Sequence, residues 1–199
     1  MDKIKLMIVE DDPVWMKGLT EYIEKEGDIV VVKQALSKEE ATGITPPEVD
    51  VVLIDLQLSE DGGELCGLGV ASRLAELGVD KMIMLTSRDE PDIILEAFDR
   101  GAINYIMKSS YKDIPRAVRD ARDGKVSLHS DVSGVLTAEL RKERKLKRLT
   151  PTEREVYELK NQGFSRVQIA QKLYKSVETV KKQVKLIQSK LNPTSDNEQ

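Results

Sequence analysis

The sequence predicts a doubly wound α/β domain with a five-stranded parallel sheet, followed by a small all-α helix-turn-helix domain. Short apolar segments alternate with helical segments five times before residue 124, as in a parallel sheet covered by helices on both faces. Three capped helical segments follow after residue 149. The charge supports two domains, because residues 1–125 hold 26 acidic and 16 basic side chains, net −10, whereas residues 126–199 hold 9 and 15, net +6.

Five short apolar segments are expected to form the strands. They are residues 5–9, 29–35, 49–55, 81–86 and 102–107. Runs of this length, rich in β-branched residues and bounded by turn residues, are typical of buried strands. Between them, apolar residues at helical spacing, together with capping and stop residues, indicate helices. We expect these over residues 13–26, from 37 to the prolines at 46 and 47, and over 70–77, 91–100 and 110–124.

The rear of the chain divides into a linker and a helical domain. Residues 125–148 lack a clear strand–helix pattern, and we interpret them as a linker, part loop and part helix. Helices are expected over 150–162, 165–174 and 176–191, and the short break before the last of them fits a helix-turn-helix. The predicted domains are therefore residues 1–124, a linker at 125–148, and residues 149–199. The last helix is expected to bury four residues on one side: Val177, Val180, Val184 and Ile187.

Composition excludes several classes of protein. A single cysteine, Cys66, and a single histidine, His129, exclude an internal disulfide, a multi-cysteine zinc site and a histidine metal cluster, and they argue against a Ser-His-Asp triad. Strongly apolar runs are far shorter than the roughly 20 residues of a membrane span. The chain also reaches the acidic residues 10–12 too soon for a signal peptide. We expect a cytoplasmic protein with no membrane partner.

Polar residues gather where the predicted strands end, which is where parallel sheets bind ligands. Glu10 and Asp11 follow the first strand, Asp55 ends the third, Thr86 ends the fourth and Lys108 follows the fifth. Converging carboxylates favour a hard cation such as Mg²⁺. With an ammonium and a hydroxyl nearby, the set suits a phosphoryl group, and Asp55 is the candidate nucleophile. The alternative for any single aspartate is that it only caps the next helix.

Four motifs in the front domain, IVEDD, VVLIDLQL, MLTS and YIMK, carry a resemblance to a known family. Residues 1–124 resemble the CheY-like receiver domain of bacterial two-component signalling. The resemblance implies that Asp55 is the phosphoacceptor, and that a histidine kinase is the partner that donates the phosphoryl group. It implies Mg²⁺ as the cofactor, with Asp11 as a direct ligand, Glu10 acting through water, and Asp55 and the backbone carbonyl of Gln57 completing the metal set. Three further roles are implied: Thr86 and Tyr105 form the switch, and Lys108 contacts the phosphate.

The front domain departs from the family pattern after the predicted acceptor. Ser59 stands where the family often has proline, and residues 59–69 form a longer stretch than the commonest form. Both departures lie at the mouth of the predicted pocket. They bear on phosphoryl lifetime and metal affinity.

The tail carries a second resemblance. It contains LTPTEREV, then the pattern G-F-S-x-x-x-I-A-x-x-L over residues 163–173, then S-x-E-T-V-K over 176–181. Residues 149–191 resemble the LuxR-type helix-turn-helix of NarL/FixJ response regulators, with glutamine at 183 where histidine is usual. A helix of this kind enters the major groove of double-stranded promoter DNA. The candidate DNA-contacting residues are Arg166, Thr179, Lys181, Lys182, Gln183 and Lys185.

The sequence therefore predicts a DNA-binding response regulator and not an enzyme, forming a homodimer when phosphorylated or bound to DNA. One alternative is a phosphorylation-controlled signalling adaptor whose tail binds protein; a salt-dependent DNA shift assay separates the two. A second is an aspartate-nucleophile phosphohydrolase. That enzyme would need another aspartate two residues after Asp55, where this chain has Gln57.

Overall fold

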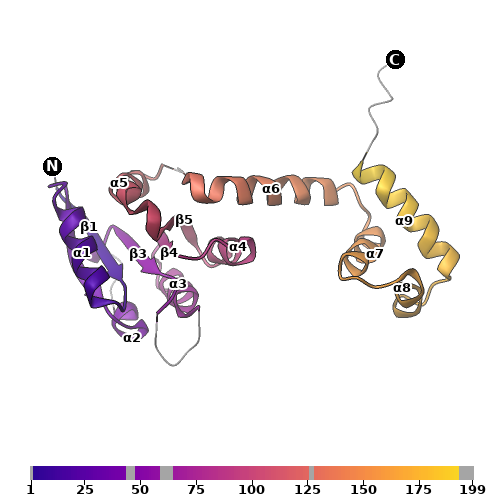
Figure 1. Cartoon of the computed structure of the whole chain (residues 1–199), viewed down its shortest axis with the longest axis horizontal. Coiled ribbons are helices and arrows are strands. Elements are labelled where there is room, and N and C mark those ends of the chain that lie inside the picture. Colours follow the sequence, from indigo (N-terminus) through magenta and orange to yellow (C-terminus); the bar gives the residue numbers. More distant parts are fainter. Residues whose placement is uncertain (1, 44–47, 59–64, 126–127, 193–199) are drawn as a thin grey trace, which may run out of the picture. The chain divides into compact units, whose positions relative to one another are not determined.

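The structure is a computed structural model that describes residues 2–43, 48–58, 65–125 and 128–192. It divides into two compact units, residues 1–136 and 137–199. The first unit is an α/β domain and the second is helical (Figure 1). The expected linker, residues 125–148, spans the division between the two units.

The sheet of the first unit is five-stranded and entirely parallel, as predicted, in the order β2-β1-β3-β4-β5. Its strands are β1 (Ile4–Val9), β2 (Ile29–Ala35), β3 (Val51–Asp55), β4 (Met82–Thr86) and β5 (Ala102–Met107). The chain reverses its winding direction between β1 and β3, where Val9 pairs with Ile54. The residues that follow these two strands therefore emerge side by side, at the place where such sheets bind ligands.

Helices cover both faces of the sheet (Figure 1). They are α1 (Pro13–Glu24), α2 (Lys38–Thr42), α3 (Cys66–Glu76), α4 (Pro91–Asp99) and α5 (Ile114–Arg122). Apolar residues of α1 and α5 share one core with the sheet, whereas those of α2, α3 and α4 share the other. Every residue of β3 and β4 is buried, because both of their faces are covered.

Two helices differ from the sequence-based prediction at their starts. The helix predicted over residues 70–77 begins at Cys66, because the backbone of Gly67 packs on the end of β3 and its N–H donates to the carbonyl of Leu56 at 3.1 Å. The helix predicted from residue 110 begins with a 3₁₀ segment, η2 (Lys108–Asp113), and becomes α-helical at α5. Residues 59–64 of the longer stretch after β3 lie outside the described residues.

A long helix, α6 (Ser130–Leu146), occupies most of the expected linker. Its first turn belongs to the first unit, where Val132 is fully buried and Asp131 accepts a hydrogen bond from the N–H of Met107 at 3.0 Å. Its last residue, Leu146, is buried in the core of the second unit. Leu140 between them is exposed. The helix agrees with the interpretation of the linker as part helix. Because only its ends are covered, it lacks the continuous apolar stripe that would have predicted its full length.

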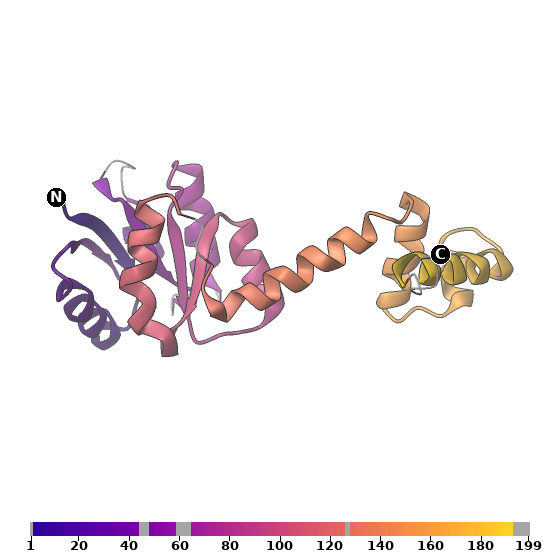
Figure 2. The same cartoon turned by 90° about the horizontal axis from the view of Figure 1, so that it is seen from above.

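The second unit packs α7 (Pro151–Asn161), α8 (Arg166–Lys172) and α9 (Val177–Leu191) around one small core (Figure 2). Capping boxes at Thr150 and Ser165 begin the first two helices, as the sequence indicated. Glu153 is buried and receives the ammonium of Lys190 at 2.7 Å, which holds the pKa of that carboxyl below its usual range. This ion pair fixes the start of α7 to the end of α9.

Candidate functional site

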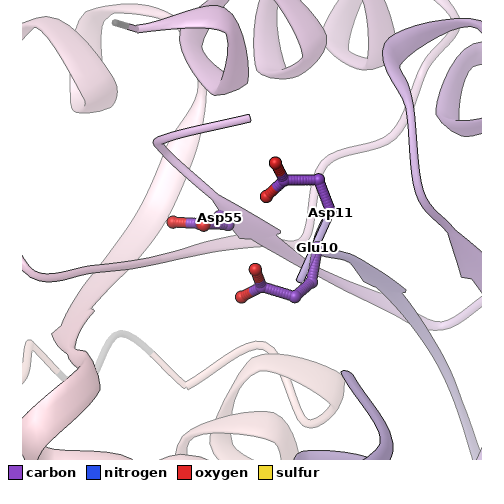
Figure 3. A group of neighbouring side chains, drawn as sticks. All are labelled: Glu10, Asp11 and Asp55. Carbon is purple, nitrogen blue, oxygen red and sulfur yellow. The ribbon is translucent and has the colours of Figure 1, made fainter. Parts of the chain in front are cut away.

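Three carboxylates meet at the carboxyl end of the sheet. Glu10 and Asp11 follow β1 and Asp55 ends β3, and one oxygen from each lies within 4.8 Å of the others. Figure 3 shows the three side chains directed toward a common space. Glu10 is 1% exposed and Asp55 is 3% exposed, so the cluster is largely withdrawn from water. The predicted convergence of these three residues is found in the structure.

A single ammonium group bridges two of the carboxylates. Nζ of Lys108 lies 2.7 Å from Oε2 of Glu10 and 3.0 Å from Oδ2 of Asp55. The contact with Asp55 is a hydrogen bond, whereas Oε2 of Glu10 is buried and makes no hydrogen bond of good geometry within the described part of the chain. Lys108 thus pairs with both of the buried carboxylates of the cluster.

The electrostatics of the cluster follow from its burial and from the charges that lie close together in it. Burial, reinforced by the nearby charge of Asp55, raises the pKa of Glu10 to about 7. Burial likewise raises the pKa of Asp55, although Lys108 opposes the shift. Burial acts against the charged form of Lys108, but the carboxylates of Glu10 and Asp55 outweigh it and raise the pKa of the ammonium. Negative charge in this pocket is costly, and an added cation would relieve that cost.

The neighbouring residues Asp12 and Gln57 have separate positions. Asp12 caps α1, because its carboxylate accepts from the N–H groups of Val14 at 2.8 Å and Trp15 at 3.1 Å. Its exclusion from the predicted metal set agrees with this geometry. The N–H of Gln57 donates to Oδ1 of Asp55 at 3.2 Å, which orients the carboxylate.

The predicted switch residues lie together on β4 and β5. Thr86 is fully buried at the end of β4, and its Oγ1 accepts from the N–H of Arg88 at 3.1 Å. Tyr105 is also fully buried, and its hydroxyl donates to the carbonyl of Arg88 at 2.8 Å. Burial raises the pKa of Tyr105 to about 12, so the phenol stays protonated. One short segment after β4 therefore contacts both side chains.

Two residues at the site were not among the sequence-based candidates. The first is Trp15 of α1, whose ring centroid lies 5.3 Å from Nζ of Lys108. The second is Gly67 of α3, where a Cβ atom would lie 2.1 Å from the carbonyl oxygen of Asp55. Both contacts join segments distant in sequence, so no local pattern could have indicated them.

The surface of α9 matches the prediction for its basic residues. Thr179, Lys181, Lys182 and Lys185 are all exposed, as is Arg166 at the start of α8. At 100° per residue, Lys182 and Lys185 project from the side opposite the buried residues of α9. This side of the helix is therefore polar and positively charged.

Two expectations about α9 need correction. Val177 was expected in the core but is 44% exposed, because it opens the helix at the end of the apolar stripe, where fewer neighbours cover it. Gln183 was expected to be available to solvent but is half-buried, and its Oε1 accepts from Nζ of Lys175 at 3.4 Å. A base contact by Gln183 would require this hydrogen bond to break.

Comparison with known proteins assigns both units. The family model for the response regulator receiver domain matches residues 6–119, and the model for bacterial regulatory proteins of the luxR family matches residues 147–199. The chain belongs to the response regulators that join a receiver domain to a LuxR-type DNA-binding domain. It is thus a two-component regulator of transcription, of the NarL type, and its receiver domain implies a histidine kinase partner.

Its relatives match over nearly the whole chain. It is 31% identical to the DNA-binding transcriptional activator DevR/DosR of Mycobacterium tuberculosis, covering 94% of this chain and 88% of the relative. It is 29% identical to a nitrate/nitrite response regulator protein homolog of Haemophilus influenzae, covering 96% and 91%. These similarities favour the DNA-binding interpretation of the tail over the adaptor alternative.

Solved structures of response regulators share the architecture. One contains two RcsB dimers bound to two parallel DNAs, with a TM-score of 0.59, 25% identity, and coverage of 96% of this chain and 92% of that chain. Another is the response regulator ChrA of a haem-sensing system, with a TM-score of 0.56, 29% identity, and coverage of 96% and 90%. Receiver domains bind Mg²⁺ at an acidic site, and Glu10, Asp11 and Asp55 form such a cluster here. Among the described residues, no helix is both long enough and apolar enough to cross a bilayer.

Proposed function

We propose that Asp55 accepts a phosphoryl group from a histidine kinase and that this event controls promoter binding by the C-terminal unit. The observation that carries the proposal is the meeting of Asp55 with Glu10, Asp11 and Lys108 in one buried cluster. Two acidic neighbours and one ammonium around a strand-end aspartate suit the attack of a carboxylate on phosphorus. We place the protein in the cytoplasm and regard acceptance of the phosphoryl group as its only chemistry.

We infer that Mg²⁺ occupies the acidic cluster when the site is loaded. The fit is supported by the meeting of three carboxylates, one oxygen of each within 4.8 Å of the others, and by the buried Oε2 of Glu10, which lacks a hydrogen bond of good geometry within the described ranges. Asp11 and Asp55 would bind the ion directly, with the backbone carbonyl of Gln57, and Glu10 would act through water. The ion would supply positive charge to the phosphoryl oxygens.

The chain's own residues have distinct tasks in this proposal. Oδ1 of Asp55 is oriented by the N–H of Gln57, while Oδ2 faces the ammonium of Lys108. Once phosphorus is bound to Asp55, Lys108 is placed to pair with a phosphoryl oxygen. The hydroxyl of Thr86 is the hydrogen-bond donor at the end of β4. A hydrogen bond from this hydroxyl to the phosphoryl group would disturb the segment at Arg88, which now contacts both Thr86 and Tyr105. That disturbance would shift the receiver between two conformations.

Removing Asp11 should weaken metal binding far more than removing Asp12. We expect Asp11→Ala to lower Mg²⁺ affinity at least about tenfold, because it deletes a ligand from the cluster. Asp12→Ala should leave the affinity nearly unchanged but reduce the free energy of unfolding by about 1 kcal/mol, because it deletes the cap of α1. A metal titration and a urea unfolding curve for each variant measure the two effects. Equal losses of metal affinity would show that the ligand assignment is wrong.

We further propose that α9 enters the major groove as a homodimer forms on double-stranded promoter DNA. The support is the exposed basic side of α9 together with the family assignment of the tail. Lys181, Lys182 and Lys185 are the candidate contacts on α9, with Thr179 at its start and Arg166 on α8. Gln183 is the remaining candidate and would have to leave Lys175.

The salt dependence of DNA binding tests whether the lysines of α9 contact DNA. Lys182→Ala should weaken DNA binding across many sequences and reduce the slope of log affinity against log salt concentration by about 1, because one phosphate contact is lost. Lys160→Ala removes the same charge from the exposed surface of α7 and serves as the control. Binding titrations at several salt concentrations measure both slopes. The interface is misplaced if the two variants lose affinity equally.

A further inference from the structure

We propose that Trp15 is a positioning residue for phosphoryl transfer: its indole ring holds the ammonium of Lys108 beside Glu10 and Asp55. The inference rests on the proposed role of Asp55 as acceptor and extends the site to a side chain of α1. Trp15 is the only tryptophan of the chain, and it lies on α1, the helix that comes after Glu10 and Asp11.

The ion pairs of Lys108 do not by themselves fix the position of its ammonium group. It begins η2, a segment in which Ser110 departs from helical geometry, and its side chain is 22% exposed. A lysine side chain carries a compact charge on a flexible four-carbon stem. Attraction to carboxylates alone therefore leaves several side-chain conformations open to it. The Trp15 ring, with its centroid 5.3 Å from Nζ, supplies a second attractive surface. A cation within about 6 Å of an indole centroid is stabilised by the negative face of the ring.

Trp15 holds the ammonium of Lys108 through the face of its ring and not through the indole N–H. Nε1 of Trp15 is buried, and it has no hydrogen-bond partner among the described residues. A buried donor without an acceptor costs stability, so the N–H cannot be the reason for a tryptophan here. Another aromatic ring should therefore replace Trp15 in function, whereas an aliphatic side chain of similar bulk should not.

The ring is itself held by aromatic contacts with the segment that carries Lys108. Tyr111 of η2 lies edge-on to Trp15, with ring centroids 6.3 Å apart and an interplanar angle of 81°. Tyr22 of α1 lies edge-on to Tyr111 at 5.1 Å. Its hydroxyl donates to the carbonyl of Lys112 at 3.5 Å. These contacts fix η2 against α1, so the Trp15 ring and the Lys108 stem stay in register.

The kinetic test compares phosphorylation of the full chain by acetyl phosphate at saturating Mg²⁺. Trp15→Leu should lower the rate at saturating donor about tenfold, which corresponds to about 1.4 kcal/mol in the barrier. Trp15→Phe should restore most of the rate. Leu19→Val shortens a different buried side chain of the same helix, and it should leave the rate unchanged. Equal rates for Trp15→Leu and wild type would overturn the proposal.

A double-variant cycle shows whether Trp15 acts through Lys108. In a Lys108→Ala background, Trp15→Leu should have no further effect on the rate. The same fold loss in both backgrounds would mean that Trp15 acts independently of the lysine, and the proposal would fail. Failure of the wild type itself to accept a phosphoryl group would instead refute the proposed function.

A metal-free measurement on the wild-type protein does not depend on phosphorylation activity. In the presence of EDTA, the ring current of Trp15 should move the ε-methylene protons of Lys108 upfield of those of exposed lysines in NMR spectra. Trp15→Leu should abolish this displacement, and Leu19→Val should preserve it. Ordinary chemical shifts for Lys108 in the wild-type protein would overturn the proposal.

Discussion

Asp55→Asn is expected to abolish phosphorylation of the protein while leaving its fold intact. The amide retains the shape of the carboxylate at the end of β3 but removes the nucleophilic oxygen and its charge. Removing one of three crowded negative charges should also keep or raise the free energy of unfolding, because Asp55 is buried near Glu10. Intact-mass measurement after incubation with a small phosphodonor and Mg²⁺ detects the added phosphoryl group.

A matched control lies at the other end of the same strand. Asp50 comes just before β3, whereas Asp55 is the last residue of that strand, so the two aspartates lie at opposite ends of it. The carboxylate of Asp50 accepts a hydrogen bond from the N–H of Lys5 at 2.8 Å. Asp50→Asn should therefore gain the phosphoryl mass as the wild type does. A stable mass increase in Asp55→Asn equal to that of the wild type would show that another residue is the acceptor.

Gly67→Ala is expected to be among the most damaging single substitutions in the receiver domain. The new Cβ would lie 2.1 Å from the carbonyl oxygen of Asp55 and 2.7 Å from Cα of Leu56, so backbone must move. We expect a loss of about 3 kcal/mol in the free energy of unfolding, as for severe overpacking. Because the displaced backbone carries Asp55, phosphorylation should slow even where the protein remains folded. Chemical unfolding and phosphorylation rates measure the two effects.

Gly69 provides the control on the same helix. A Cβ atom at Gly69 would meet only Nζ of Lys38, at 3.7 Å, which is an ordinary contact. Gly69→Ala should therefore be neutral or stabilise α3 by up to about 1 kcal/mol through helix propensity. Similar losses for the two glycine variants would indicate that close approach to β3 is not the reason for glycine at position 67.

The sequence predicted those features that local patterns determine. Each strand was a short apolar run, and the acidic residues after β1 and β3 had to meet because parallel strands end at one edge of the sheet. Thr86 and Lys108 were placed at that edge by the same reasoning. Capping boxes at Thr150 and Ser165 likewise marked the starts of α7 and α8.

Features that depend on tertiary contacts were not predictable in the same way. Helix α6 is covered only near Val132 and Leu146, so the sequence indicated a linker that is helical in part and not one helix of this length. Trp15 meets Lys108 across 93 positions of sequence, and the approach of Gly67 to Asp55 exists only once α3 packs on β3. In each case the informative neighbour is distant along the chain.

In the proposed function, a phosphoryl group on Asp55 controls DNA binding by the C-terminal unit. The most direct measurement is the affinity of the full chain for its promoter DNA, selected from genomic fragments, with and without a small phosphodonor and Mg²⁺. The phosphodonor should raise the affinity of the wild type and leave that of Asp55→Asn unchanged. The proposed function would be contradicted by an equal rise in Asp55→Asn, or by unchanged affinity of a wild-type protein that mass measurement shows to be fully phosphorylated.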